Sequence, residues 1–559
     1  MEKGIKGLPK VRQEFSRNYF DELYDRVKDN RRLPVWEGEL YFEYHRGTYT
    51  SMARNKRSNR KSEILMMDLE LLSLIASWQG VEYDKAAMDK MWTTILLNQF
   101  HDILPGSSIH EVYEVTKKEY AELWEQGMAM ISERIAALAG EGEAVTVFNT
   151  LGFDRNDIVS LPENVSGALA DEEGHIYPVQ TAGGKKVAYV HGLPSKGYKS
   201  FKVVENAEQE IPFTRNGNSL ETPFYSVTFD ENGLFTSIFD KKNDREILQD
   251  NKKGNLFTMY EDKPIYYDNW DIDIFYTEKK WDAEQLENMT WEMGPVCTVI
   301  EQERRISNSL IRQKIYFYAD SARIDFETYV DWKEHQHLLK VNFPVDIHTD
   351  EASFDVQFGN LTRKVHTNTS WDMARFESCG QKFMDLSEGH YGVSLLNDCK
   401  YGHSVKDSVM ALTLIKSGIE PNPVTDQEEH FFTYAIYPHA GNLRDCDTVE
   451  EAYRLNFPAY AKAGAKAGAS ESLLRTDKKN VMIETVKEAE DNSGLIVRVY
   501  EYENTKTKAA LTFGMGKEIV SVTECNLMEE PETEMAHTND SFEFVIKPFE
   551  VKTFKVVLK

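Results

Sequence analysis

The spacing of apolar residues changes near residue 140, and that change limits the folds open to this chain. Between residues 62 and 138, apolar side chains recur every three or four positions in three runs, which is the period of an amphipathic helix. From Ala144 onward they alternate in short runs that end at turn signals such as Asn232-Gly233, as in antiparallel sheets. The sequence therefore predicts a multidomain α+β protein in which a three-helix bundle precedes large antiparallel β-sandwich domains.

A chain of 559 residues exceeds the roughly 250–300 residues over which one hydrophobic core extends, so we expect several domains. The bundle is expected over 61–140, a small β-domain over 141–215 and a large β-sandwich over 216–458. An Ala-, Gly- and Lys-rich run over 459–470 is typical of a linker. A C-terminal β-domain over 471–559 completes the predicted order.

The first 60 residues contain few signals of regular structure. Phe15 to Val27 favours a short helix, and the mixture of apolar and acidic residues over Val35 to Glu43 predicts a strand. One helix and one strand do not bury a core, so 1–60 is interpreted as the end of another domain. The basic cluster from Arg54 to Lys61 is expected to be a solvated surface or to pair with acids of that domain.

Composition narrows the classes of partner. The chain has 65 basic and 92 acidic residues and a formal net charge of −27, which argues against nucleic acid and against anionic membrane surfaces. No apolar run approaches the roughly 20 residues of a membrane span, and residues 1–6 form no secretory signal. Five cysteines without a CxxC pair favour reduced thiols in a cytoplasmic protein. The sequence leaves open whether the chain forms a homo-oligomer.

The segment from Leu96 to Ser108 places His101 beside Asp102 where a predicted helix meets a Pro-Gly-Ser turn. An adjacent imidazole and carboxylate are able to serve a zinc ion and a polar substrate together. The alternative is a capping or surface pair at a helix end. His110 is the bundle's only other histidine and is expected to be an ordinary residue at a helix N-terminus.

Several further motifs, in order along the chain, give it a resemblance to glycoside hydrolase family 38, the zinc-dependent α-mannosidases, in its bacterial and fungal vacuolar branch. The resemblance implies an α/β barrel-like catalytic domain, of which 1–60 would be the C-terminal remnant, then the bundle and a galactose-mutarotase-like super-sandwich. The motifs are Gly38–Glu43, His45–Ser51, Asn98–Ile103, Tyr267–Ile272, Asn368–Asp372, Tyr391–Gly402 and Phe432–His439.

The resemblance implies a retaining α-mannosidase that acts on mannose-containing oligosaccharides, with His101 as a zinc ligand and Asp102 as the acceptor of a substrate hydroxyl. The His-x-Asp zinc pair of the family is not found before residue 60, and the resemblance implies that the nucleophilic Asp belongs to the same missing domain. We therefore expect an incomplete, inactive C-terminal part whose zinc site is incomplete and metal-free or weakly loaded. The alternative is a non-catalytic carbohydrate-binding or structural module.

Five further residues in these motifs are candidates. Glu39 and Glu43 lie four apart on the predicted strand and would share a face, so either is a candidate general acid or a solvent-facing acid. Arg46 is a candidate for holding a substrate hydroxyl, or else forms an ion pair. Asp268 and Trp270 are candidates for a wall over the sugar, with the indole stacked on it, or for pinning a loop.

Overall fold

The computed structural model describes residues 6–7, 9–205, 209–468 and 470–559, and the chain divides into two units, 1–42 and 43–559. Residues 1–5, where no secretory signal was expected, and Ala469 of the predicted linker lie outside the described residues. Among the described residues, no helix is long and apolar enough to cross a membrane.

The first unit contains α1 (Ser16–Val27), which confirms the predicted helix. The predicted strand over 35–43 is wrong, because residues 35–42 form no strand in the described chain. Gly38 has a φ of 111°, a conformation outside the extended region of L-residues, and the segment pairs with no described strand. Alternation alone does not form a strand without a partner to complete its hydrogen bonds.

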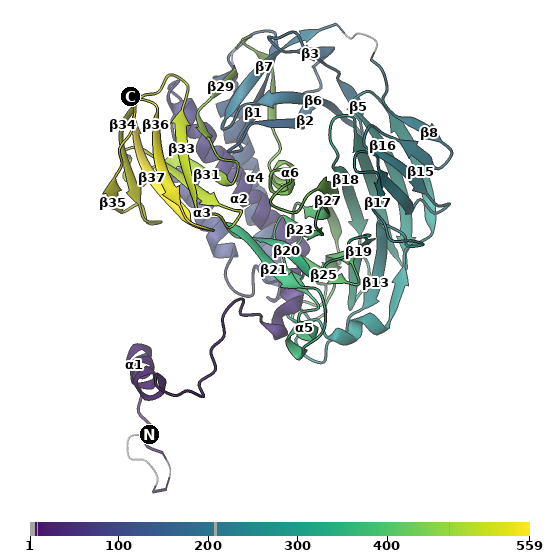
Figure 1. Ribbon diagram of the computed structural model, residues 1–559, viewed down its shortest axis with the longest axis vertical. Coiled ribbons are helices and arrows are strands. Elements are labelled where there is room, and N and C mark those ends of the chain that lie inside the picture. The colour runs from purple at the N-terminus through teal and green to yellow at the C-terminus, as the bar shows by residue number, and fades with distance from the viewer. Residues whose placement is uncertain (1–5, 8, 206–208, 469) are drawn as a thin grey trace. The chain divides into compact units, whose positions relative to one another are not determined.

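In the second unit the short helix η1 (Glu43–Tyr49) is followed by the helical bundle (Figure 1), which confirms the predicted three helices. They are α2 (Ala53–Ser77), α3 (Lys85–Asn98) and α4 (His110–Ala139). Gly127 of α4 lies against α2, where an added Cβ would approach the Leu65 side chain to 2.6 Å, so this glycine permits the close packing of the two helices.

The basic cluster belongs to the first turns of α2, which begin eight residues or so earlier than the apolar period indicated. The expectation that this cluster forms a solvated surface is wrong, because Lys56 and Arg60 are buried. Arg54 pairs with Glu428 at 2.8 Å. Lys61 pairs with Asp398 at 3.1 Å. The cations therefore attach α2 to the neighbouring β-sandwich rather than to another domain.

The small β-region after the bundle joins strands from distant parts of the sequence. The predicted linker is wrong over 460–465, which form β28 and pair antiparallel with β1, while β29 pairs with β7. Alanine side chains at this sheet edge pack in the same apolar cluster as β1. The strands are β1 (Ala144–Asn149), β2 (Arg155–Leu161), β3 (Ala168–Ala170), β4 (Ile176–Tyr177), β5 (Gln180–Ala182), β6 (Lys185–Leu193), β7 (Gly197–Val204), β28 (Tyr460–Ala465) and β29 (Ser470–Ser472).

The large sandwich confirms the predicted antiparallel architecture. A nine-stranded sheet has the order β15-β16-β17-β18-β27-β24-β23-β20-β21, and a six-stranded sheet has the order β14-β13-β19-β26-β25-β22. Their facing side chains, such as Phe326 and Phe343, form one apolar core. The nine strands are β15 (Leu286–Met293), β16 (Cys297–Ile306), β17 (Ser309–Tyr318), β18 (Ile324–Asp331), β20 (Glu351–Val356), β21 (Gly359–Lys364), β23 (Phe383–Ser387), β24 (Tyr391–Asn397) and β27 (Glu429–Ala440). The six are β13 (Leu256–Glu261), β14 (Lys280–Asp282), β19 (His337–Pro344), β22 (Ser378–Cys379), β25 (Gly402–Lys406) and β26 (Val409–Lys416).

Two further groups of strands and three short helices complete the second unit. The first group, before the sandwich, is β8 (Thr214–Asn216), β9 (Ser219–Glu221), β10 (Tyr225–Phe229), β11 (Phe235–Asp240) and β12 (Arg245–Glu246). The C-terminal group is β30 (Leu474–Thr476), β31 (Val481–Glu488), β32 (Leu495–Glu501), β33 (Thr507–Phe513), β34 (Ile519–Cys525), β35 (Pro531–Glu534), β36 (Ser541–Ile546) and β37 (Val551–Leu558). The short helices within the sandwich region are η2 (Ile274–Glu278), α5 (Ser370–Ala374) and α6 (Thr448–Asn456).

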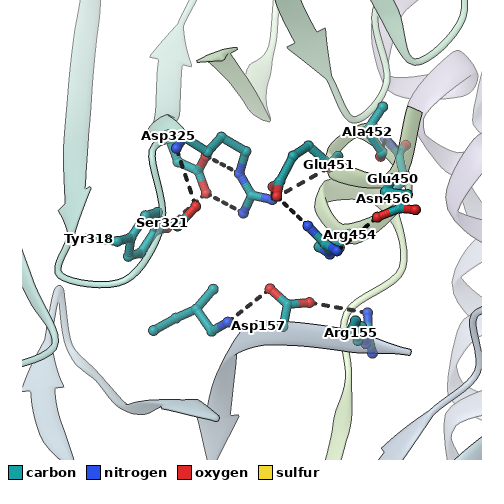
Figure 2. Close-up of polar contacts among 12 residues, drawn as sticks. Arg155, Asp157, Tyr318, Ser321, Asp325, Glu450, Glu451, Ala452, Arg454 and Asn456 are labelled. Carbon is teal, nitrogen blue, oxygen red and sulfur yellow. Dashed lines mark hydrogen bonds and ion pairs between the residues drawn. The ribbon is translucent and has the colours of Figure 1, made fainter. Parts of the chain in front are cut away.

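A buried ionic network connects the small β-region to the sandwich through α6 (Figure 2). Arg323 pairs with Asp325 at 2.6 Å and with Glu451 of α6 at 3.0 Å. Arg155 of β2 donates a hydrogen bond of 2.7 Å to the carbonyl oxygen of Phe457, just after α6. Because these groups are buried, each charge depends on its partner, and the network fixes the three elements relative to one another.

Candidate functional site

Three segments that are far apart in the sequence meet at one end of the bundle. They are the short helix η1 (Glu43–Tyr49), the turn over 101–107 after α3, and the loop over 267–271. The Gly47 amide donates to the Trp270 carbonyl at 2.9 Å. The Asn269 amide group donates to the Gly106 carbonyl at 3.1 Å. One backbone hydrogen bond and one from the buried Asn269 side chain therefore hold the three segments together.

Glycine is required at both close approaches. A Cβ at Gly47 would lie 2.5 Å from Cε of Lys416 and 3.0 Å from the Asn269 carbonyl oxygen. A Cβ at Gly106, where φ is 87°, would lie 2.1 Å from the Ser51 carbonyl oxygen. A larger residue at Gly47 or Gly106 would therefore clash with the neighbouring segment.

The structure brings together Asp102 and Trp270, two of the predicted substrate-binding residues. Oδ1 of Asp102 accepts a hydrogen bond from Nε1 of Trp270 at 3.2 Å and another from the Ser107 hydroxyl at 2.7 Å. The Tyr113 hydroxyl donates to the Asp102 carbonyl oxygen at 2.8 Å. Asp102 has a φ of 66°, in the left-handed region that Asp tolerates better than most residues. Two donors therefore orient the carboxylate, and a third holds the backbone of the same residue.

His101 lies next to this carboxylate in sequence and is exposed. Its ring contacts that of Phe100, with centroids 4.3 Å apart. Among the described residues, the one group of three His, Cys, Asp or Glu side chains close enough to share a metal is Asp171, Glu173 and His175. His101 is not in that group, so the described residues do not form a zinc site around it.

Arg46 is buried, and its guanidinium is already engaged by the protein. Its Nε and Nη2 donate to the Ala374 carbonyl at 3.1 and 2.8 Å, and Nη1 donates to the Glu43 carbonyl. Nη1 also lies 3.3 Å from Oδ1 of Asp271, and the guanidinium covers the Phe376 ring at 4.4 Å. Arg46 therefore connects η1 to the loop over 267–271 and to the segment after α5.

Asp268 is buried in the same region. Its Oδ2 accepts a hydrogen bond of 2.7 Å from the Ile419 amide, whereas Oδ1 has no hydrogen-bond partner among the described residues. Beneath the loop, Asp262 pairs with Lys416. Burial raises the pKa of Asp262 to about 6, against the attraction of Lys416, and the nearby Asp268 and Asp271 raise it further. The region around the loop is therefore rich in buried carboxylates.

The two glutamate candidates do not share a strand face, since residues 35–42 are not a strand. Glu43 is exposed in the first turn of η1, and Glu39 belongs to the other unit. Sequence reasoning missed Ser107 and Tyr113, which orient Asp102, although Ser107 stands within the His-Asp motif. The Tyr113 contact had no local sequence signal.

The fold and this site define a class of protein in which a helical bundle and β-sandwiches bring together loops that carry several carboxylates. Three family descriptions match: "Alpha mannosidase middle domain" over 43–138, "Glycosyl hydrolases family 38 C-terminal domain" over 220–424, and "Glycosyl hydrolases family 38 C-terminal beta sandwich domain" over 480–554. The chain belongs to glycoside hydrolase family 38, and the resemblance found in its motifs is confirmed.

Similar proteins cover the chain almost entirely. Alpha-mannosidase G of Dictyostelium discoideum is 31% identical over 99% of this chain and 55% of its own length. Alpha-mannosidase 2C1 of Homo sapiens is 31% identical over 99% of this chain and 53% of its own length. The chain thus spans about half the length of these relatives. The crystal structure of an alpha-mannosidase from Enterococcus faecalis V583 shares the fold, with a TM-score of 0.79 and 18% identity over 96% of this chain and 72% of that one.

Proposed function

We propose that the protein containing this chain is a retaining α-mannosidase that hydrolyses α-mannosyl linkages of mannose-containing oligosaccharides. The observation that carries the proposal is the alignment of 99% of the chain with a protein named alpha-mannosidase at 31% identity. The convergence of Asp102 and Trp270 in one site adds support from the geometry. The five free cysteines are compatible with a cytoplasmic location, which stays a prediction.

In this proposal Asp102 accepts a hydrogen bond from a hydroxyl of the bound mannose. The indole N–H and the Ser107 hydroxyl both bind Oδ1, so they orient the carboxylate and leave Oδ2 for the substrate. Trp270 lies beside it, only partly buried, where its ring is able to stack on an apolar sugar face. Arg46 acts by positioning the segments that hold these two residues.

Zinc is the proposed cofactor, with His101 as one ligand. A catalytic zinc normally has three or four protein ligands, and its chemistry is to act as a Lewis acid on bound oxygen. One exposed imidazole does not hold zinc tightly, so we propose that the further ligands and the nucleophilic carboxylate lie outside this sequence. A retaining enzyme needs two carboxyl groups about 5–5.5 Å apart, and Glu39 and Glu43 remain candidates for one of them.

The test is hydrolysis of an aryl α-mannoside by the full protein, measured for wild type, Asp102→Asn and Asp89→Asn. Asp89 is exposed on α3 of the same bundle and serves as the matched control. We expect Asp102→Asn to lower kcat/KM by about a hundredfold, since a charge-assisted hydrogen bond is lost in the transition state, and Asp89→Asn to leave it unchanged. If wild type binds α-mannosides but does not cleave them, the alternative of a non-catalytic carbohydrate-binding module is correct.

A further inference from the structure

A groove lies on the nine-stranded sheet where β16, β17, β18 and β27 are neighbours. Two cavities of about 620 and 430 Å³ occupy it, and Arg57 and Phe431 line both. Cavities of this size are typical of small-molecule sites. The residues that line them differ from those of the candidate site around Asp102.

Two aromatic side chains lie at these cavities: Phe431, which is exposed and lines both, and the half-buried Tyr329, which lines the larger one. Phe431 of β27 and Tyr329 of β18 are directly opposite one another in the sheet register, with ring centroids 5.1 Å apart. Phe431 is 52% exposed, although a phenylalanine on a sheet is usually covered by a packing partner. Exposed aromatic faces of this kind are suited to stacking on the apolar C–H faces of sugar rings.

Charged side chains beside the pair alternate in sign across the strands. Arg312 lies 2.5 Å from Glu303, and Lys314 lies 3.8 Å from Glu301 and 3.9 Å from Glu327. The larger cavity is lined by five cationic and four acidic side chains, so it is almost neutral on a chain whose net charge is −27. Paired charges offer many hydrogen-bond donors and acceptors without attracting a strongly charged ligand. A neutral, hydroxyl-rich ligand meets these conditions.

We propose that this groove is a second saccharide-binding site, distinct from the site around Asp102, in which a sugar ring stacks on Phe431 and contacts the edge of the neighbouring Tyr329. Flanking sugar units occupy the two cavities and hydrogen-bond to the paired charges along β16 and β17. The site retains a polymeric or branched glycan on the protein while its ends are processed elsewhere. The choice of mannose as the sugar rests on the proposed function, whereas the stacking geometry does not.

The test is affinity electrophoresis of the full protein through gels that contain soluble α-mannan, alongside hydrolysis of a small aryl α-mannoside. Phe431→Ala and Tyr329→Ala should weaken retardation by roughly tenfold, the size expected for a lost stacking contact. Their aryl α-mannoside kinetics should match wild type. Phe358→Ala is the control, because Phe358 is also exposed, at 41%, but lies outside the groove, at the turn between β20 and β21. Equal thermal midpoints of the variants establish that each remains folded.

Retardation that is unchanged in Phe431→Ala, or lost equally in Phe358→Ala, would overturn the proposal. So would retardation that 0.5 M salt abolishes in wild type and Phe431→Ala alike, since that result describes an anion site. A protein that cleaves the aryl α-mannoside without being retarded refutes the groove alone. A protein that is retarded through Phe431 but cleaves nothing refutes the proposed catalytic function alone.

Discussion

Replacing Arg46 tests whether it positions the site or binds substrate. The guanidinium is buried and donates at least four interactions, to the Ala374 and Glu43 carbonyls and to Asp271. Arg46→Met removes all of them and leaves the Asp271 carboxylate buried without its cation. Burial already raises the pKa of Asp271, against the attraction of Arg46. Removing one partner of a buried pair costs about 3–5 kcal/mol.

The loss of stability should be confined to η1 and the loop over 267–271, because Arg46 joins these two segments. Hydrogen exchange of amides in these two segments reports the free energy of local opening, and 3–5 kcal/mol corresponds to exchange about a hundred- to several-thousand-fold faster. Arg46→Lys keeps the charge but loses the planar fork to Ala374, so it should cost about 1–3 kcal/mol. Aryl α-mannoside hydrolysis should fall in the order of the exchange rates.

The matched control is Arg57→Met, which removes an exposed arginine of α2 that touches none of these segments. It should leave exchange over 43–49 and 267–271 unchanged. The reasoning is refuted if Arg46→Met leaves exchange in both segments at the wild-type rate while hydrolysis is lost. Arg46 would then act on the substrate directly, as its motif position also allowed.

Three further outcomes are expected. His101→Ala should lower bound zinc, measured by elemental analysis of the full protein, together with activity, whereas His110→Ala should change neither; a loss of activity with zinc retained would make His101 a substrate residue. Gly47→Ala should shift η1, because its Cβ would lie 2.5 Å from Lys416, and should lower the thermal midpoint by several degrees; an unchanged midpoint would contradict the steric argument. Burial lowers the pKa of His403 and His430 from 6.5 to about 3, so each contributes stability above pH 6.5 that is lost as the pH falls toward 3. Gln at either position should reduce the slope of unfolding free energy against pH in that window, and an unchanged slope would refute it.

Local pattern was enough to predict elements whose hydrogen bonds or apolar face lie close in sequence. The three helices follow from a 3.6-residue period, and Leu65 and Leu69 are buried as that period requires. The Asn232-Gly233 turn signal lies between two paired strands, β10 over Tyr225–Phe229 and β11 over Phe235–Asp240. The segment over 35–43 has a similar alternation but no partner strand, which no local pattern reveals.

Long-range contacts set the limit of sequence reasoning at the site. Asp102 and Trp270 were both predicted to bind substrate, yet their contact joins residues 168 positions apart and depends on how the sandwich packs against the bundle. The start of α2 was predicted too late because Lys56 and Arg60 are charged and interrupt the apolar period. Both are buried nevertheless, since they donate hydrogen bonds to carbonyl groups of distant loops. The amino-acid sequence near α2 contains no signal for these carbonyl acceptors, which come from distant parts of the chain.

The start of α2 shows why the bundle and the sandwich act as one structure at the site. A helix leaves its first amide groups without partners, and Met52, the residue before α2, has a φ of 57° and provides no side-chain cap. Asp426, which precedes β27 of the sandwich, accepts hydrogen bonds from the Met52 and Ala53 amides at 2.8 and 2.7 Å. Burial raises the pKa of this carboxyl to about 7. The sandwich thus supplies the cap of the helix that follows η1, so the site around Asp102 requires both parts to be folded together.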